Sequence, residues 1–330
     1  MSFWKQIRYR LEHRMCRALA RWIPRLSREM CLRIACLLGN AACFLDRKGC
    51  AIALENLECA FGDRFNPEQR RRMACASYRN FARTMLDLFW APSLTAENFR
   101  RYIHVSGFDE IRERLIRESR GAVFMCVHQG NWEWANLAVG FLGLDTAVVA
   151  EKFKNPSLTT VFSGLRQISG QQIISQENSL LRLLKVIKRR GHAGMLIDLS
   201  LRPTQAATVI EGFGLEMCVP LLHAVLAERT GALLIPVETE PLPDGTCRVI
   251  AHREVEWPAG ATVREIAQRC WDRFEPIITA RPGDYLWPYK HFRYRPDDAT
   301  RPYPPYANHS GAFEKLRRET IAPRPPAQAS

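Results

Sequence analysis

The segment "GAVFMCVHQGNWEWANL" (residues 121–137) joins an uninterrupted apolar run to a polar turn and a second, tryptophan-edged stretch. The run 121–127 is short and apolar throughout, which predicts a strand buried on both of its faces. Asn131 is a preferred N-cap residue, so a helix is predicted to begin directly after it. His128 therefore lies at the carboxyl end of a strand, and Glu133 lies in the first turn of a helix.

The chain on either side of this segment predicts an α/β fold with a central, largely parallel β-sheet flanked by helices. Short apolar strands alternate with helices from residue 121 onward, and helical patterns fill residues 46–118, with starts at Asn66 and after Ser93. In such sheets ligands bind at the carboxyl ends of the strands, where His128 lies. The other predicted strands are 146–151, 171–175, 193–198, 207–210, 232–239 and 247–255, and the helices between them are 132–142, 157–168, 178–190 and 219–230.

The first 26 residues predict a basic amphipathic helix, because apolar residues recur at three- and four-residue spacing among arginines. Such a helix can lie in the headgroup region of an anionic membrane, although a surface helix packed on its own domain is an open alternative. The apolar run 34–45 is too short to span a bilayer, and arginines interrupt the region where a signal peptide would be continuously apolar. The apolar positions of the helix are Trp4, Ile7, Leu11, Met15, Ala18, Leu19 and Trp22.

These patterns divide the chain into three parts. Residues 1–48 are interpreted as a helical membrane-associating region, and residues 49–296 as the α/β domain. The proline-rich, polar segment 297–330 is predicted to be a loop or a flexible tail.

The formal net charge of +13, from 47 lysines and arginines against 34 acidic residues, favours an acidic partner. An anionic membrane surface, an acidic carrier protein and nucleic acid all fit this sign. The basic clusters lie on helical patterns without interleaved aromatic residues, so no nucleic-acid partner is predicted. The eleven cysteines form no CxxC pair and the histidines no metal-binding pattern, which predicts free thiols in a reducing cytoplasm and no metal.

His128 and Glu133 suit the removal of a proton from a hydroxyl group. A carboxylate bonded to one imidazole nitrogen fixes the tautomer and stabilises the imidazolium, which leaves the other nitrogen to accept the proton. The chain has no GxSxG, Walker A or GxGxxG motif, so the nucleophile would come from the substrate. The spacing alone leaves open that His128 is a hydrogen-bonded structural residue.

Several ordered motifs resemble the bacterial lipid A biosynthesis acyltransferases of the lauroyl and myristoyl type, within the wider lysophospholipid acyltransferase superfamily. Lys152 stands where an arginine is usual, Asp198 is followed by Leu199 rather than Gln or His, and Tyr289 replaces a frequent His. These departures leave the identity of the acceptor open. The motifs, spread over roughly residues 50–296, are "HQGNWE" (128–133), "ALENLECAF" (53–61), "EKFKNPSL" (151–158), "LAERTGALLIPV" (226–237) and "PGDYLWPYKHFRYRP" (282–296).

The resemblance implies transfer of an acyl chain from an acyl carrier protein thioester, or less often a coenzyme A thioester, to a hydroxyl group of a lipid such as a lipid A precursor or a related glycolipid. It implies that His128 is the general base and that Glu133 is its partner. Candidates for substrate binding are Asn131, Lys152, Arg166 and Asp198. No cofactor is expected, and the enzyme is expected to be a peripheral or monotopic protein on the cytoplasmic face of the inner membrane.

Two other functions fit the same residues. The first is a non-catalytic lipid-binding protein on the membrane surface, against which the intact pair of His128 and Glu133 argues. The second is a hydrolase of acyl thioesters, which would release free fatty acid without any lipid acceptor.

Overall fold

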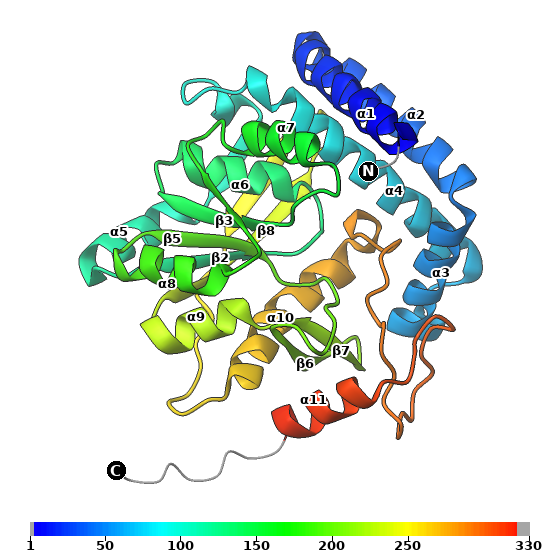
Figure 1. Cartoon of the computed structure of the whole chain (residues 1–330), viewed down its shortest axis with the longest axis vertical. Coiled ribbons are helices and arrows are strands. Elements are labelled where there is room, and N and C mark those ends of the chain that lie inside the picture. The colour runs from blue at the N-terminus through cyan, green and yellow to red at the C-terminus, as the bar shows by residue number, and fades with distance from the viewer. Residues whose placement is uncertain (1–2, 322–330) are drawn as a thin grey trace.

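A seven-stranded sheet forms the centre of the computed structural model, which describes residues 3–321 (Figure 1). Neighbouring strands run parallel except for one antiparallel pair, β8 with β9. The predicted α/β fold with a largely parallel sheet is therefore confirmed. In spatial order the strands are β1 (Ile103–Ser106), β9 (Cys247–Ala251), β8 (Leu233–Pro241), β2 (Ala122–Cys126), β5 (His192–Leu196), β3 (Thr146–Ala150) and β4 (Gln172–Ser175).

The central strand β2 is buried on both faces, which explains its apolar run. Val123 and Met125 belong to one hydrophobic core, and Ala122 and Phe124 belong to the other, because successive side chains of a strand point to opposite faces. Helices α8, α9 and α10 contribute to the first core, whereas α5, α6 and α7 contribute to the second (Figure 1). Their bounds are α5 (Phe108–Glu118), α6 (Trp132–Phe141), α7 (Pro156–Arg166), α8 (Ser179–Lys188), α9 (Leu222–Thr230) and α10 (Val263–Ala280).

Four elements were not predicted from the sequence: β1, α10, the strand β7 (Leu215–Pro220) and the C-terminal helix described below. Strand β1 lies in a stretch predicted to be helical, and it forms because it pairs with the distant strand β9. Helix α10 begins with a capping box between Thr262 and Glu265, a local signal that marks its start. Short 3₁₀ helices join several elements: η1 (Ile23–Arg25), η2 (Gly62–Arg64), η3 (Ala91–Ser93), η4 (Phe99–Arg101) and η5 (Pro282–Asp284).

The C-terminal segment contradicts the prediction of a flexible tail from residue 297. Helix α11 (Gly311–Ile321) packs on a hairpin of β6 (Ala207–Gly212) and β7, below the main body in Figure 1. Phe313 of α11 is fully buried against Val209 and Cys218 of the hairpin. The proline-rich composition gave no sign of this anchor, and residues 322–330 lie outside the described residues. The domain boundaries at 48 and 296 stay predictions.

Four helices form the N-terminal part and run along one side of the molecule (Figure 1). The predicted helix start at Asn66 is confirmed, because Asn66 and Gln69 form a capping box. Among residues 3–321, no helix is both long and apolar enough to cross a bilayer. The four helices are α1 (Phe3–Trp22), α2 (Arg28–Leu45), α3 (Arg47–Phe61) and α4 (Pro67–Trp90).

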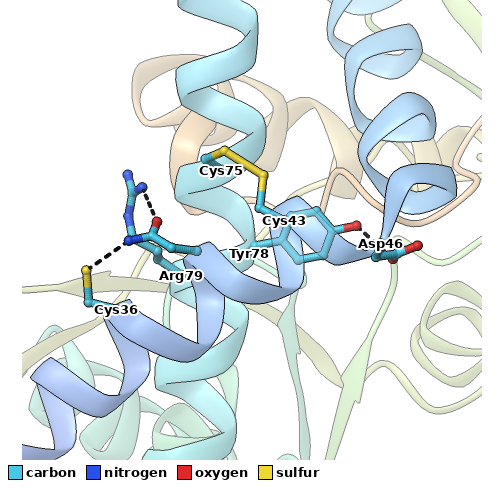
Figure 2. Close-up of a disulfide and its surroundings, with 7 residues drawn as sticks. Cys36, Cys43, Asp46, Cys75, Tyr78 and Arg79 are labelled. Atoms are coloured by element: carbon cyan, nitrogen blue, oxygen red, sulfur yellow. Dashed lines mark hydrogen bonds between the residues drawn. A yellow bond between two sulfur atoms is a disulfide. The ribbon is translucent and has the colours of Figure 1, made fainter.

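Helices α2 and α4 are joined by a disulfide between Cys43 and Cys75 (Figure 2). The prediction that all cysteines are free thiols is therefore wrong for these two. The cause is tertiary, since the packing of α2 on α4 brings their Cα atoms within 5.6 Å although 32 positions separate them. Nearby, the hydroxyl of Tyr78 on α4 donates to Asp46, the residue between α2 and α3 (Figure 2).

Candidate active site

The turn between β2 and α6 carries His128 as predicted. Gly130 in this turn has a φ of +59°, and a Cβ there would lie 2.4 Å from Thr239 Oγ1 on β8. Glycine is therefore required both by the backbone conformation and by the close approach of β8. The Thr239 hydroxyl donates to the carbonyl oxygen of Gln129 at 2.6 Å, which fixes the turn against the sheet.

His128 pairs with Asp198, the residue that follows β5 by two positions. The Nδ1–H of His128 donates to Asp198 Oδ1 at 2.8 Å, and its backbone N–H donates to Oδ2 at 3.0 Å. Asp198 is fully buried, which raises a carboxyl pKa, but the charge and hydrogen bonds of His128 outweigh this and lower the pKa of Asp198. An ionised Asp198 places the proton of the neutral imidazole on Nδ1 and leaves Nε2 as the proton acceptor.

The segment after η5 covers this pair. The backbone N–H of Leu286 donates to the carbonyl oxygen of His128 at 2.9 Å. The Nε2–H of His291 donates to the Leu286 carbonyl at 2.8 Å, so its Nδ1 accepts from the Tyr285 hydroxyl at 3.2 Å. Burial lowers the pKa of His291, and burial together with the Asp198 carboxylate raises the pKa of Tyr285. Both groups are therefore neutral beside Asp198.

Glu133 has a different partner from the predicted one. It lies in the first turn of α6 as expected, but its carboxylate bonds to Arg166 at the end of α7. The contact is bidentate: Nε lies 2.9 Å from Oε2, and Nη2 lies 2.6 Å from Oε1. The predicted role of carboxylate partner to His128 therefore falls to Asp198 in this structure. Glu133 instead joins α6 to α7 beside the site.

Asn131 is the N-cap of α6, as predicted, because its Oδ1 accepts from the backbone N–H of Trp134 at 3.0 Å. Its amide nitrogen donates to Asp87 on α4 at 2.8 Å. Asn80 and Thr84, also on α4, both donate to the carbonyl oxygen of Gly130 at 2.9 Å. Helix α4 therefore holds the turn that carries His128 through these hydrogen bonds.

Lys152 and Arg166, both proposed from the sequence, line one cleft of about 330 Å³. The cleft lies at the carboxyl ends of β3 and β4, where parallel sheets commonly bind ligands. Arg182 of α8 is its third cation and Glu151 contributes one carboxylate, while Phe153 and Phe162 form an apolar wall. Lys152 also forms an exposed ion pair with Glu177 at 2.8 Å.

A larger cleft of about 660 Å³ lies elsewhere, between α10 and the β6–β7 hairpin. Glu211, Asp272 and Glu275 contribute carboxylates to its lining. None of the site residues predicted from the sequence is among its lining residues, so we place the site at the carboxyl edge of the sheet.

The sequence matches the family model described as bacterial lipid A biosynthesis acyltransferase over residues 9–294. The chain belongs to this family. The resemblance identified from the motifs is therefore confirmed, and the protein is an acyltransferase.

The chain is similar to named acyltransferases from several bacteria. The chain is 24% identical to a phosphatidylinositol mannoside acyltransferase of Mycobacterium tuberculosis (strain ATCC 25618 / H37Rv), over 64% of the chain and 68% of the relative. It is 27% identical to the enzyme of the same name from Mycolicibacterium smegmatis, over 64% and 69%. It is 20% identical to a lipid A biosynthesis lauroyltransferase of Escherichia coli K12, over 85% and 91%.

Sequence reasoning missed the contributions of Asp87 and His291. Asp87 interrupts the apolar run "MLDLFW" (85–90) on a helix, and a lone carboxylate among apolar residues signals a buried charge that needs a partner. The sequence gives no comparable local signal for His291, whose ring stacks on Tyr285 with centroids 4.8 Å apart.

Proposed function

We propose that this acyltransferase moves a fatty acyl chain from a thioester on an acyl carrier protein to a hydroxyl group of a glycolipid, such as a lipid A precursor, at the membrane surface. One observation carries the proposal: a buried His128–Asp198 pair stands at the carboxyl edge of the sheet in a chain of this family. Similar proteins named for lipid A and for phosphatidylinositol mannoside acylation support a glycolipid acceptor.

In this proposal Nε2 of His128 takes the proton of the acceptor hydroxyl as the oxygen attacks the thioester carbonyl. Asp198 holds Nδ1–H and stabilises the imidazolium that forms. When the tetrahedral intermediate collapses, the carbon–sulfur bond breaks and the imidazolium returns the proton to the leaving thiolate. The products are the new ester and a free thiol, and no acyl group passes through the enzyme.

The cleft beside Glu133 supplies the part of the site that binds an anionic group. Lys152, Arg166 and Arg182 line it, and Arg166 is held in place by its bidentate pair with Glu133. Guanidinium and ammonium groups in this arrangement suit a phosphate of the acceptor. Asn131 lies outside this part of the proposal, because both atoms of its amide are already bonded.

The exposed apolar side chains of helices α1 and α2 support the proposal that the enzyme binds an anionic membrane. Helix α1 packs on its own domain through Tyr9, whose hydroxyl donates to the carbonyl oxygen of Lys154, while Trp4 is 77% exposed. Helix α2 adds Leu37, which is 70% exposed. The other large apolar residues exposed on the two helices are Phe3, Leu11, Met15, Leu19, Trp22, Met30, Leu38, Phe44 and Leu45.

Basic residues surround this apolar surface, which favours anionic lipid over other partners. Arg10, Arg14, Arg17 and Arg21 are exposed along α1. We propose that the enzyme lies on the cytoplasmic face of the inner membrane. Its net positive charge would there also attract an acidic carrier protein.

Incubation of the membrane-bound full chain with labelled acyl carrier protein thioester and total lipid extract tests this function. The expected product is a labelled glycolipid, identified by mass spectrometry, with label transfer that requires the extract. Release of labelled free fatty acid without lipid would instead show a thioester hydrolase. Binding of lipid with no consumption of the thioester would show a non-catalytic lipid-binding protein.

A further inference from the structure

Helix α4 carries a buried carboxylate that the chemistry above does not use. The side chain of Asp87 is 1% exposed, and two arginines and one amide from different elements converge on it. Arg28 Nη2 lies 2.7 Å from Oδ1, Asn131 Nδ2 lies 2.8 Å from Oδ2, and Arg83 Nε lies 3.6 Å from Oδ2. A buried carboxylate is retained only when it is paired in this way.

Asp87 fixes the orientation of the amide that caps α6. Burial raises the pKa of Asp87, against the opposing charges of Arg28 and Arg83. Its Oδ2 accepts from Nδ2 of Asn131, and this hydrogen bond selects the amide orientation that presents Nδ2 to Asp87. Oδ1 of Asn131 is then directed at the backbone N–H of Trp134, where it caps the helix. The indole N–H of Trp134 donates to the backbone carbonyl of Asp87 at 3.1 Å, which gives the same two helices a second tie.

Arg28 extends this contact to the N-terminal helices. It lies in the first turn of α2, and its guanidinium lies over the rings of both Trp90 and Trp134, 4.7 and 4.8 Å from their centroids. The same group donates to the carbonyl oxygen of Gly245 at 2.9 Å. Arg28, Asp87 and Asn131 thus form a continuous chain of polar contacts from α2 to the turn that carries His128.

We propose that Asp87 is a positioning residue for acyl transfer: bound by Arg28, it holds Asn131 in its capping orientation and so sets the turn that presents His128. This inference rests on the proposed role of His128 as the base. Asp87 itself touches no reacting atom. Its effect is expected in kcat, since a displaced turn moves the base without altering where the acyl donor binds.

Two single variants separate this role from folding. Asp87→Asn leaves two arginines and the Asn131 amide facing a single neutral amide oxygen, and we expect kcat to fall about 10- to 100-fold while KM for the acyl donor changes by less than about twofold. Asn131→Ser keeps a good N-cap but removes the donor to Asp87. It should lower kcat in the same direction with the fold retained, so the proposal stays testable if Asp87→Asn fails to fold.

A double variant tests the hydrogen bond directly. In Asp87→Asn combined with Asn131→Asp, the carboxylate at position 131 accepts both from the Trp134 N–H and from the new amide at position 87. The helix cap is kept, and the hydrogen bond between positions 87 and 131 re-forms with donor and acceptor exchanged. The kcat should therefore exceed that of Asp87→Asn alone. A merely structural carboxylate predicts no such rescue, because the double variant still leaves Arg28 without its original partner.

The matched control is Tyr78→Phe, which removes the hydrogen bond of another α4 residue to Asp46, away from the catalytic turn. It should keep the wild-type kcat. Unchanged kcat in Asn131→Ser, an absence of rescue in the double variant, or an equal loss in Tyr78→Phe would each overturn the proposal. His128→Ala reports separately on the proposed function, because transfer that survives in that variant removes the base role whatever Asp87→Asn does.

Discussion

Asp198 accepts a hydrogen bond from Nδ1 of His128 at 2.8 Å, although 70 positions separate the two residues. The register of β2 on β5 explains the contact. It pairs Cys126 with Leu196, so two positions further along each chain His128 and Asp198 stand opposite one another. The histidine and its carboxylate partner therefore meet because two parallel strands end together at one edge of the sheet.

Asp198→Asn should lower kcat by about 100-fold or more, because the imidazolium formed during transfer loses its counter-charge. Steady-state acyl transfer from a labelled thioester measures this. Asp297→Asn is the matched control, since Asp297 holds Nδ1 of His309 at the same 2.8 Å on the exposed C-terminal segment. Wild-type kcat in Asp198→Asn would show that the pair is structural.

Glu133→Gln should destabilise the fold more than it impairs proton transfer. It leaves the largely buried guanidinium of Arg166 without its carboxylate, so we expect the free energy of unfolding to fall by about 2–4 kcal/mol. Denaturant unfolding measures the loss. Glu177→Gln breaks an exposed pair with Lys152 and should leave stability unchanged. A greater loss of kcat than in Asp198→Asn would restore Glu133 as the partner of the base.

Lys152→Ala combined with Arg182→Ala should raise KM for a phosphorylated glycolipid by about tenfold with little change in kcat. Contacts to the phosphate stabilise the bound substrate and the transition state equally, so their loss weakens binding without slowing the chemical step. The readout is transfer to an acceptor with and without its phosphate. Arg189→Ala, at the exposed end of α8, is the control. An equal rise in KM for the acceptor that lacks phosphate would contradict anion binding in the cleft.

Trp4→Ser, Leu11→Ser and Trp22→Ser together should weaken binding to anionic phospholipid vesicles by at least about tenfold, because each substitution removes apolar area that enters the interface. Vesicle co-sedimentation measures the bound fraction. Ile116→Ser with Leu181→Ser is the control, since both residues are exposed apolar side chains outside the N-terminal helices. Truncation through Arg28 is a poorer test because it also removes the partner of Asp87. Unchanged sedimentation of the triple variant would refute the proposed membrane binding by helix α1.

His223 should make the fold acid-sensitive. Burial lowers the pKa of His223 to about 4, and neither ring nitrogen has a hydrogen-bond partner in the part of the chain that the structure describes. The unfolded chain takes up a proton below about pH 6.5 that the folded chain refuses, so stability falls as the pH falls towards about 4.

His223→Leu removes the imidazole whose protonation in the unfolded chain lowers the stability of the fold. Between pH 7 and pH 5, the free energy of unfolding should therefore fall by about 2 kcal/mol more in the wild type than in the variant. Denaturant titrations at the two pH values measure the difference. The same pH dependence in both proteins would show that the imidazole is solvated.

The local sequence was enough to predict the strand, the turn and the helix that carry the site. The apolar run, Gly130 and the cap at Asn131 each act within a few residues, so their signals lie side by side in the sequence. The family resemblance likewise rested on short ordered motifs, and it holds over most of the chain.

Contacts between residues far apart in the chain could not be predicted from the sequence. Asp198 was proposed for substrate binding because nothing local shows that β5 lies beside β2. The spacing and the family resemblance together pair Glu133 with His128, whereas the fold brings Arg166 to it. The Cys43–Cys75 disulfide and the anchoring of α11 depend in the same way on packing between distant elements.

Replacement of His128 by Ala tests the central claim most directly. The measurement is label transfer from acyl carrier protein thioester to lipid by the full-length, membrane-bound variant, with folding and vesicle binding confirmed alongside. We predict that transfer is lost while the fold and vesicle binding are retained. Transfer at the wild-type rate would contradict the assignment of His128 as the base and, with it, the proposed mechanism.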